Sequence, residues 1–207
     1  MEKYITVLGE SVSEYTEKRS KFIATIRHCD TEEEALEFID EMKSKYWDAR
    51  HNVYAYKVGN AARFSDDGEP HGTAGKPVFD VITGDGITNL AVVVTRYFGG
   101  VLLGTGGLVR AYSKASKDAL LSAQKAEMIP CTLLETECEY TDHAKLLNLI
   151  ENAGGVIEDS VFTDKVVLKY SLRDGDCEDY IKKLSENFSA RLEANQIGRK
   201  TAGFKIN

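Results

Sequence analysis

Apolar and polar residues follow two different periods along this chain, and each period predicts a different element. Near the N-terminus, the runs YITV and KFIATI are rich in β-branched and aromatic residues, which favours two strands. The segment DTEEEALEFIDEMKSKY has apolar residues three and four positions apart, as one face of a helix requires. Thr31 and Glu34 form a capping box before it. A helix is therefore predicted there, followed by a strand at NVYAYKV, residues 52–58.

The middle of the chain changes character twice. Residues 59–75 show little periodicity and predict a long loop, whereas PVFDVIT at 77–83 predicts a short helix. The segment ITNLAVVVTRY at 87–97 is nearly all apolar, which is typical of a central strand covered on both faces. After several glycines, apolar residues recur at helical spacing from Leu108 and predict a helix to about Lys125.

The last third of the chain has a regular order of predicted elements. They are strands at 128–140, 156–162, 165–172 and 191–198 and helices at 142–153 and 176–188. This β-α-β-β-α-β order is the ferredoxin-like plan. A domain boundary is predicted near Pro130, which gives one domain over 1–129 and a ferredoxin-like domain over 130–207. The fold class expected is α+β.

Composition narrows the class of protein. The chain has 207 residues, of which 43% are hydrophobic and 29% charged, as in a soluble globular protein of one large or two small domains. The first residues are acidic and lack an apolar core, which excludes a signal peptide. The longest apolar run, 90–94, is too short to span a bilayer. A cytoplasmic location without a membrane partner is expected.

Cysteine spacing and charge limit the cofactors and partners. The four cysteines include no CxxC pair and lie far from the histidines, so no zinc pattern is present, and reduced thiols are expected. No cofactor or metal is predicted. The net charge of −7 argues against a generic nucleic-acid binder and against DNA specificity, although it permits a local basic patch.

The stretch RYFGGVLLGTGGLVRAY, residues 96–112, contains two arginines and no carboxylate. It lies between a predicted strand and a predicted helix, where free backbone N–H groups can bind an anion. Thr105 is the expected helix N-cap. The alternative is that the glycines form a tight turn and a close helix–sheet contact, since the stretch matches neither GxGxxG nor a Walker loop. The candidate anion-binding residues are Arg96, Gly99, Gly100, Gly104, Thr105, Gly106, Gly107 and Arg110.

A second candidate stretch is RFSDDGEPHGTAGKP at 63–77. Its acidic residues and histidine could bind a divalent metal or form an acid–base pair, but Asp-Asp-Gly and Glu-Pro are also ordinary turn sequences. Consecutive carboxylates on a loop usually diverge, which disfavours a metal. An imidazole titrates near neutrality, so His71 is the preferred functional residue. The candidate ligand-binding residues here are Asp67, Glu69, His71 and Thr73.

A third candidate is His51, which follows Arg50 at the start of a predicted strand and therefore at a sheet end. There it could point into the same cleft as His71, or it could be a structural residue. No GxSxG or HExxH motif is present, so the sequence assigns no catalytic residue.

Taken together, three segments resemble the Impact family, in its bacterial YigZ-like branch: ARHNVYAY, FSDDGEPHGTAGKP and VVVTRYFGGVLLGTGGLVRAY. The resemblance spans about residues 15–125, and the remainder resembles the small C-terminal domain of that branch. It implies an N-terminal α/β sandwich like the second domain of ribosomal protein S five and a C-terminal domain like one of elongation factor G.

The resemblance also implies a role in translation. Eukaryotic Impact proteins regulate translation under amino-acid starvation by competing for a protein that activates an initiation-factor kinase. They use an additional N-terminal domain that has no counterpart in these residues, so that mechanism does not transfer directly.

Three hypotheses follow. We favour a translation-related binding module that contacts the ribosome, RNA or a translation-associated protein through the glycine-rich, arginine-flanked surface. The second is a binder of a phosphate-bearing small molecule, or an enzyme, that uses the 66–71 and 99–107 loops. The third is an adaptor for a protein partner, which an exposed apolar patch would indicate.

Overall fold

The structure is a computed structural model that describes residues 3–84 and 86–206. The chain is α+β, as the sequence predicted, and the structure contains two antiparallel sheets. It divides into two compact units, which contain Tyr4–Glu127 and Met128–Gly203. None of the helices in the described part of the chain has the length and apolar character that crossing a membrane requires.

The N-terminal unit contains a five-stranded sheet in the order β2-β3-β6-β4-β5, with neighbouring strands antiparallel. The predicted apolar strand, β6, is central: Val92 and Val94 face one hydrophobic cluster, and Ala91 and Val93 face the other. Both faces of β6 are therefore buried. The strands are β2 (Glu10–Glu17), β3 (Ser20–His28), β4 (His51–Val58), β5 (Ala61–Ser65) and β6 (Leu90–Tyr97).

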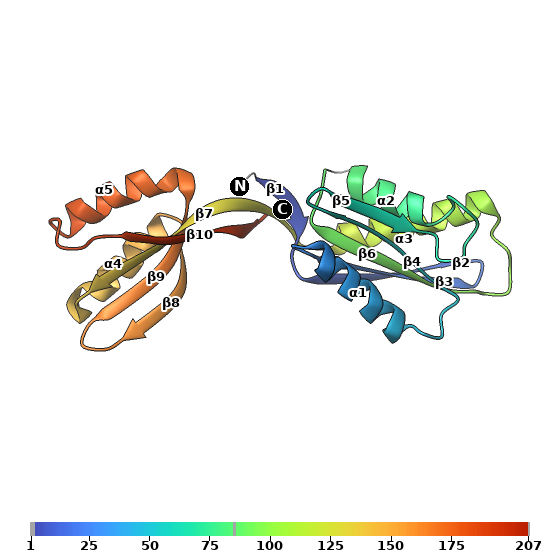
Figure 1. Ribbon diagram of the computed structural model, residues 1–207, viewed down its shortest axis with the longest axis horizontal. Helices are drawn as coiled ribbons and strands as arrows, with labels where there is room; N and C mark the ends of the chain where they lie inside the picture. Colours follow the sequence, from blue (N-terminus) through green and yellow to red (C-terminus); the bar gives the residue numbers. More distant parts are fainter. Residues whose placement is uncertain (1–2, 85, 207) are drawn as a thin grey trace. The chain divides into compact units, whose positions relative to one another are not determined.

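Three helices cover this sheet. The helices α2 (Gly75–Gly84) and α3 (Thr105–Ser122) pack on one face, and α1 (Glu32–Lys45) packs on the other (Figure 1). The predicted capping box holds α1: Thr31 accepts the Glu34 N–H, and the Glu34 carboxylate accepts the Asp30 N–H.

Two strands of this unit were missed by the sequence analysis. The predicted loop at 59–75 contains β5, and β2 was not predicted at all. Both are edge strands of the sheet. They have many exposed residues, so neither shows the apolar run that revealed β6. The helix predicted to reach Lys125 ends at Ser122, where the chain becomes extended at Ala123.

The C-terminal unit has the predicted ferredoxin-like order of elements. In its sheet, β7 lies between β9 and β10, and β8 pairs with β9. A further short strand of the chain, β1, spans Tyr4–Val7. Alternate residues of β9, from Val166 to Leu172, are buried in the unit's core. The elements are β7 (Lys125–Cys138), α4 (Tyr140–Asn152), β8 (Val156–Phe162), β9 (Val166–Arg173), the short 3-10 helix η1 (Asp174–Asp176), α5 (Cys177–Asn187) and β10 (Asn195–Lys205).

Candidate functional site

A pocket of about 460 Å³ lies at one end of the N-terminal sheet. It is bounded by three segments that are distant in sequence: the start of β4, the turn at 68–70, and the loop from the end of β6 to the start of α3. Antiparallel pairing explains the meeting, because His51 of β4 is the register partner of Arg96 of β6. Five of the predicted site residues line this pocket, namely His51, Glu69, Arg96, Gly104 and Thr105.

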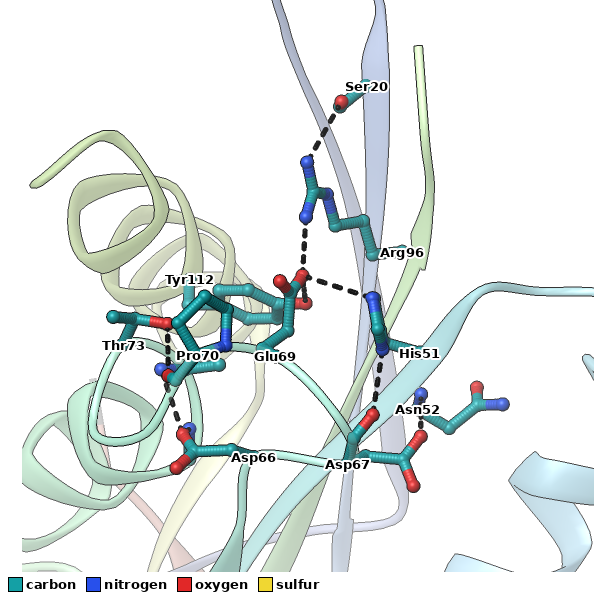
Figure 2. A network of polar contacts seen from close by, with 12 residues as sticks. Ser20, His51, Asn52, Asp66, Asp67, Glu69, Pro70, Thr73, Arg96 and Tyr112 are labelled. Atoms are coloured by element: carbon teal, nitrogen blue, oxygen red, sulfur yellow. Dashed lines mark hydrogen bonds and ion pairs between the residues drawn. The ribbon is translucent and has the colours of Figure 1, made fainter. Parts of the chain in front are cut away.

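A buried polar network forms one wall of the pocket (Figure 2). Arg96 Nη1 donates to Glu69 Oε1 at 2.5 Å, and the Tyr112 hydroxyl donates to the same oxygen at 2.8 Å. Arg96 Nη2 lies 3.4 Å from Ser20 Oγ, and His51 Nε2 lies 3.8 Å from Glu69 Oε1. Burial and the neighbouring Glu69 carboxylate raise the pKa of Tyr112, so this phenol remains a proton donor.

The burial of Arg96 corrects its predicted role. Arg96 is 5% exposed and Glu69 8% exposed, so the two charges neutralise each other inside the protein. The guanidinium also lies over the rings of Phe22 and Phe98. Arg96 Nη1 and Nη2 are therefore held by Glu69 and Ser20 inside the protein. The exposed arginine at the pocket is Arg50, which makes no ion pair with any described residue.

His51 has a defined tautomer. Its Nδ1 lies 2.7 Å from the carbonyl oxygen of Asp67, which can only accept, so Nδ1 carries the proton. The Nε2 atom of the neutral ring then has its lone pair directed to the Glu69 side of the pocket. In this tautomer, His51 can thus accept a hydrogen bond from a ligand at Nε2.

His71 does not share this pocket, contrary to the sequence hypothesis. Its side chain is fully exposed and lies 3.7 Å from Asp66. Thr73 is buried, and its hydroxyl donates to the carbonyl oxygen of Pro70, which fixes the turn. Neither His71 nor Thr73 lines the pocket.

The two consecutive aspartates of the 63–77 loop bind separate parts of the backbone. Asp66 accepts N–H groups from Gly72, Ala74 and Gly75 at the start of α2, while Asp67 accepts the N–H of Asn52 on β4. The side chains diverge (Figure 2). Among the described residues, no group of three His, Cys, Asp or Glu side chains is placed to hold a metal ion.

Removing the Asp66 carboxylate should destabilise the N-terminal unit. Burial opposes its ionisation, but the three backbone donors outweigh burial and hold the pKa of Asp66 below its ordinary value. Asp66→Ala is expected to lower the free energy of unfolding by about 2 kcal/mol at pH 7. Because the folded-state pKa is lowered, this contribution is present above about pH 4 and is lost as the pH falls through that pKa. Urea unfolding of wild type and variant at pH 7 and pH 3 measures both effects.

Asp40→Ala is the matched control, since Asp40 is exposed on α1. If Asp40→Ala lowers the free energy of unfolding as much as Asp66→Ala does, Asp66 does not act as the cap of α2. The same conclusion follows if the difference in this free energy between wild type and Asp66→Ala is no smaller at pH 3 than at pH 7.

The start of α3 also differs from its prediction. The N-cap is Gly104, with φ of 73°, and Thr105 is the first helical residue. No side chain in the described chain caps this end, and the first turn contains no acidic residue. The N–H groups of residues 105–107 precede the first helical hydrogen bond, from Leu108 N to Gly104 O. Thr105 lines the pocket, whereas Gly106 and Gly107 are not among its lining residues.

The other glycines and Arg110 have separate roles. A Cβ on Gly99 would lie 2.0 Å from the backbone of Arg19, and Gly100 has φ of +82°. These two glycines therefore form a tight turn, which is the alternative to an anion site for this stretch. Arg110 lines a neighbouring hollow with Tyr15 and Lys18, so it does not flank the pocket together with Arg96.

The apolar rim of the pocket was missed by sequence reasoning. Phe98 is 43% exposed and Leu102 82% exposed, and both line the pocket with Leu103 and Pro70. Large apolar residues in a glycine-rich loop are the signal that could have indicated a binding surface.

Comparison with known proteins matches both parts of the chain. The family model described as the Impact N-terminal domain matches residues 18–120, and the model described as domain of unknown function (DUF1949) matches residues 136–191. The chain is 36% identical over 174 residues to the IMPACT family member YigZ of Escherichia coli, covering 82% of this chain and 85% of that protein.

Two further comparisons agree. The chain is 34% identical over 169 residues to the IMPACT family member YvyE of Bacillus subtilis, covering 80% of this chain and 78% of that protein. A crystal structure titled as that of a hypothetical protein is similar at a TM-score of 0.62 and 32% identity, and covers 96% of this chain and 98% of the other.

Proposed function

This chain belongs to the Impact family, and on that premise we propose that it is a translation-associated binding module that contacts ribosomal RNA at the pocket. The observation that carries the proposal is the acid-free start of α3, without a side-chain cap, beside Arg50, which makes no ion pair with any described residue. Backbone N–H groups at a helix N-terminus and a free guanidinium are both donors for a phosphate group.

The rim supports RNA over a simple anion. Phe98 presents a half-exposed ring beside the start of α3, and unpaired RNA bases stack on such rings. A phosphate at α3 and a base on Phe98 fit a single-stranded loop of RNA. With a net charge of −7, the contact must be local, so it depends on few cations.

Arg50→Glu should therefore weaken ribosome binding. Charge-assisted hydrogen bonds contribute about 1.5–3 kcal/mol, so an affinity loss of at least about tenfold is expected. Wild-type binding should also weaken as salt rises. Equilibrium binding of labelled protein to purified ribosomes at two salt concentrations measures both effects.

Arg63→Glu is the matched control, because Arg63 is exposed on β5 and does not line the pocket. Equal losses of ribosome affinity in the two variants would reject the phosphate contact. So would a wild-type affinity that does not change with salt concentration.

A small phosphate-bearing ligand is the second candidate. The pocket volume lies within the range of small-molecule sites, roughly 300–1,000 Å³, and His51 Nε2 offers an acceptor inside it. Such a ligand at about 100 times its Kd should stabilise the protein by ~2.7 kcal/mol. A thermal-shift panel of nucleotides and sugar phosphates tests this candidate, and the absence of any shift removes it.

A further inference from the structure

The outward side of the two helices that cover the N-terminal sheet forms a second surface, which is separate from the pocket. The inward residues of α2 and α3 are buried in the core of this unit. Outward, Val109 of α3 is 37% exposed and Leu121 67% exposed, with Val81 of α2 partly exposed between the helices. Apolar side chains thus continue along the outer seam between α2 and α3.

This seam is hollowed along its length. Three adjoining hollows, of about 390, 250 and 520 Å³, all have Val81 in their lining. Val109 and Ser113 line two of them, and Lys117 and Leu121 line two. These four residues of α3 are spaced four apart, so they form one ridge about 18 Å long at ~1.5 Å per residue. The hollows therefore form one groove, the α2–α3 groove, as long as three turns of a helix.

The charges at the edges of the groove favour an acidic occupant. Its two acidic residues are already paired within their own helices, Asp80 with Lys76 and Asp118 with Lys114. Arg110 and Lys117 also line the groove and make no ion pair with any described residue. Two unpaired cations thus border an apolar floor in a protein whose net charge is −7.

We propose that the α2–α3 groove binds an acidic amphipathic helix of a partner protein. Apolar residues on one face of such a helix would fill the hollows along Val81, Val109 and Leu121, as in known helix-in-groove recognition. Carboxylates beside that face would pair with Arg110 and Lys117. The small side chain of Ser113 at the centre of the ridge leaves room for the close approach of a second helix.

A helix fits this groove better than RNA does. The groove lacks an exposed aromatic ring on which a base could stack, among the residues that line it. Its most exposed apolar residue is the aliphatic Leu121. The groove shares no lining residue with the pocket, so the proposal for the groove is tested independently of the ribosome contact.

The test uses the full chain and a designed 14-residue helical peptide with leucines on one face and glutamates on both sides of it. The same peptide with every glutamate replaced by lysine is the first control, and a 12-nucleotide uridine RNA is the second. Fluorescence anisotropy gives the affinities, and amide chemical shifts of the protein locate the binding. The acidic peptide is expected to bind at least about tenfold more tightly than the lysine peptide, with shifts in residues 76–84 and 109–121.

Leu121→Glu and Lys117→Glu are each expected to weaken the acidic peptide by about tenfold or more. Leu36→Glu is the matched control, because Leu36 is also an exposed helical leucine but lies on α1, across the sheet. Equal binding of both peptides, shifts outside α2 and α3, or indifference to Leu121→Glu would overturn the proposal. So would RNA binding that depends on Lys117 but not on Leu121, which would make the groove a nucleic-acid surface.

Discussion

Replacing Arg96 with methionine should lower the free energy of unfolding of the N-terminal unit by about 3–5 kcal/mol. The substitution leaves the buried Glu69 carboxylate without its cation, while Tyr112 alone still donates to it. Removing one partner of a buried pair is costly because the other charge stays desolvated. Since domains are stable by only about 5–15 kcal/mol, much of the stability of this unit would be lost. Hydrogen exchange followed by mass spectrometry, peptide by peptide, measures the loss in each unit separately.

The double variant Arg96→Met/Glu69→Gln is the control for this reading. A neutral glutamine can still accept from the Tyr112 hydroxyl, so the double variant should recover most of the stability that the single variant loses. If both variants lose the same amount, the cost comes from the shape of the methionine and not from the unpaired charge.

Gly99→Ala should separate the pocket loop from the sheet. The new methyl carbon would lie 2.0 Å from the Arg19 carbonyl carbon and 2.3 Å from Ser20 N, both of them backbone atoms that cannot rotate away. The Gly99 N–H also donates to Ser20 Oγ, so the movement would break this bond. We expect the free energy of unfolding to fall by about 2–3 kcal/mol. The loss in the free energy of ribosome binding should be much larger than this, because the displaced loop carries Phe98.

Gly84→Ala is the matched substitution, because a Cβ at Gly84 meets no atom within 4 Å and Gly84 has no positive φ. Urea unfolding and the ribosome assay, run on both variants, check the prediction. If the two variants are equally stable, the loop can accommodate the added methyl group, and the close contact at Gly99 does not constrain it.

The elements that could be predicted from the sequence are those whose own residues determine their burial. β6 was recognisable because its apolar run fits a strand covered on both sides, and α1 because Thr31 and Glu34 mark its start. β2 and β5 were not, because each is an edge strand with many exposed residues and therefore lacks a continuous apolar run.

The candidate site was only partly predictable for a related reason. The sequence grouped Arg96 with Arg110 because both flank the glycines, but register pairs Arg96 with Phe22 and His51 inside the sheet. Glu69 has the sequence of an exposed turn, yet it is buried because Arg96 and Tyr112 bind it. Such pairings depend on long-range contacts that local spacing does not contain.

The proposed contact between the pocket rim and ribosomal RNA is tested most directly by crosslinking. A photoreactive benzoylphenylalanine in place of Leu102, which is 82% exposed on the rim, should crosslink to ribosomal RNA when the protein is mixed with purified ribosomes. The same group in place of Leu36 should not, and Arg50→Glu should remove the crosslink from position 102. Crosslinks of equal yield from both positions, or none to RNA from position 102, would contradict the proposed function.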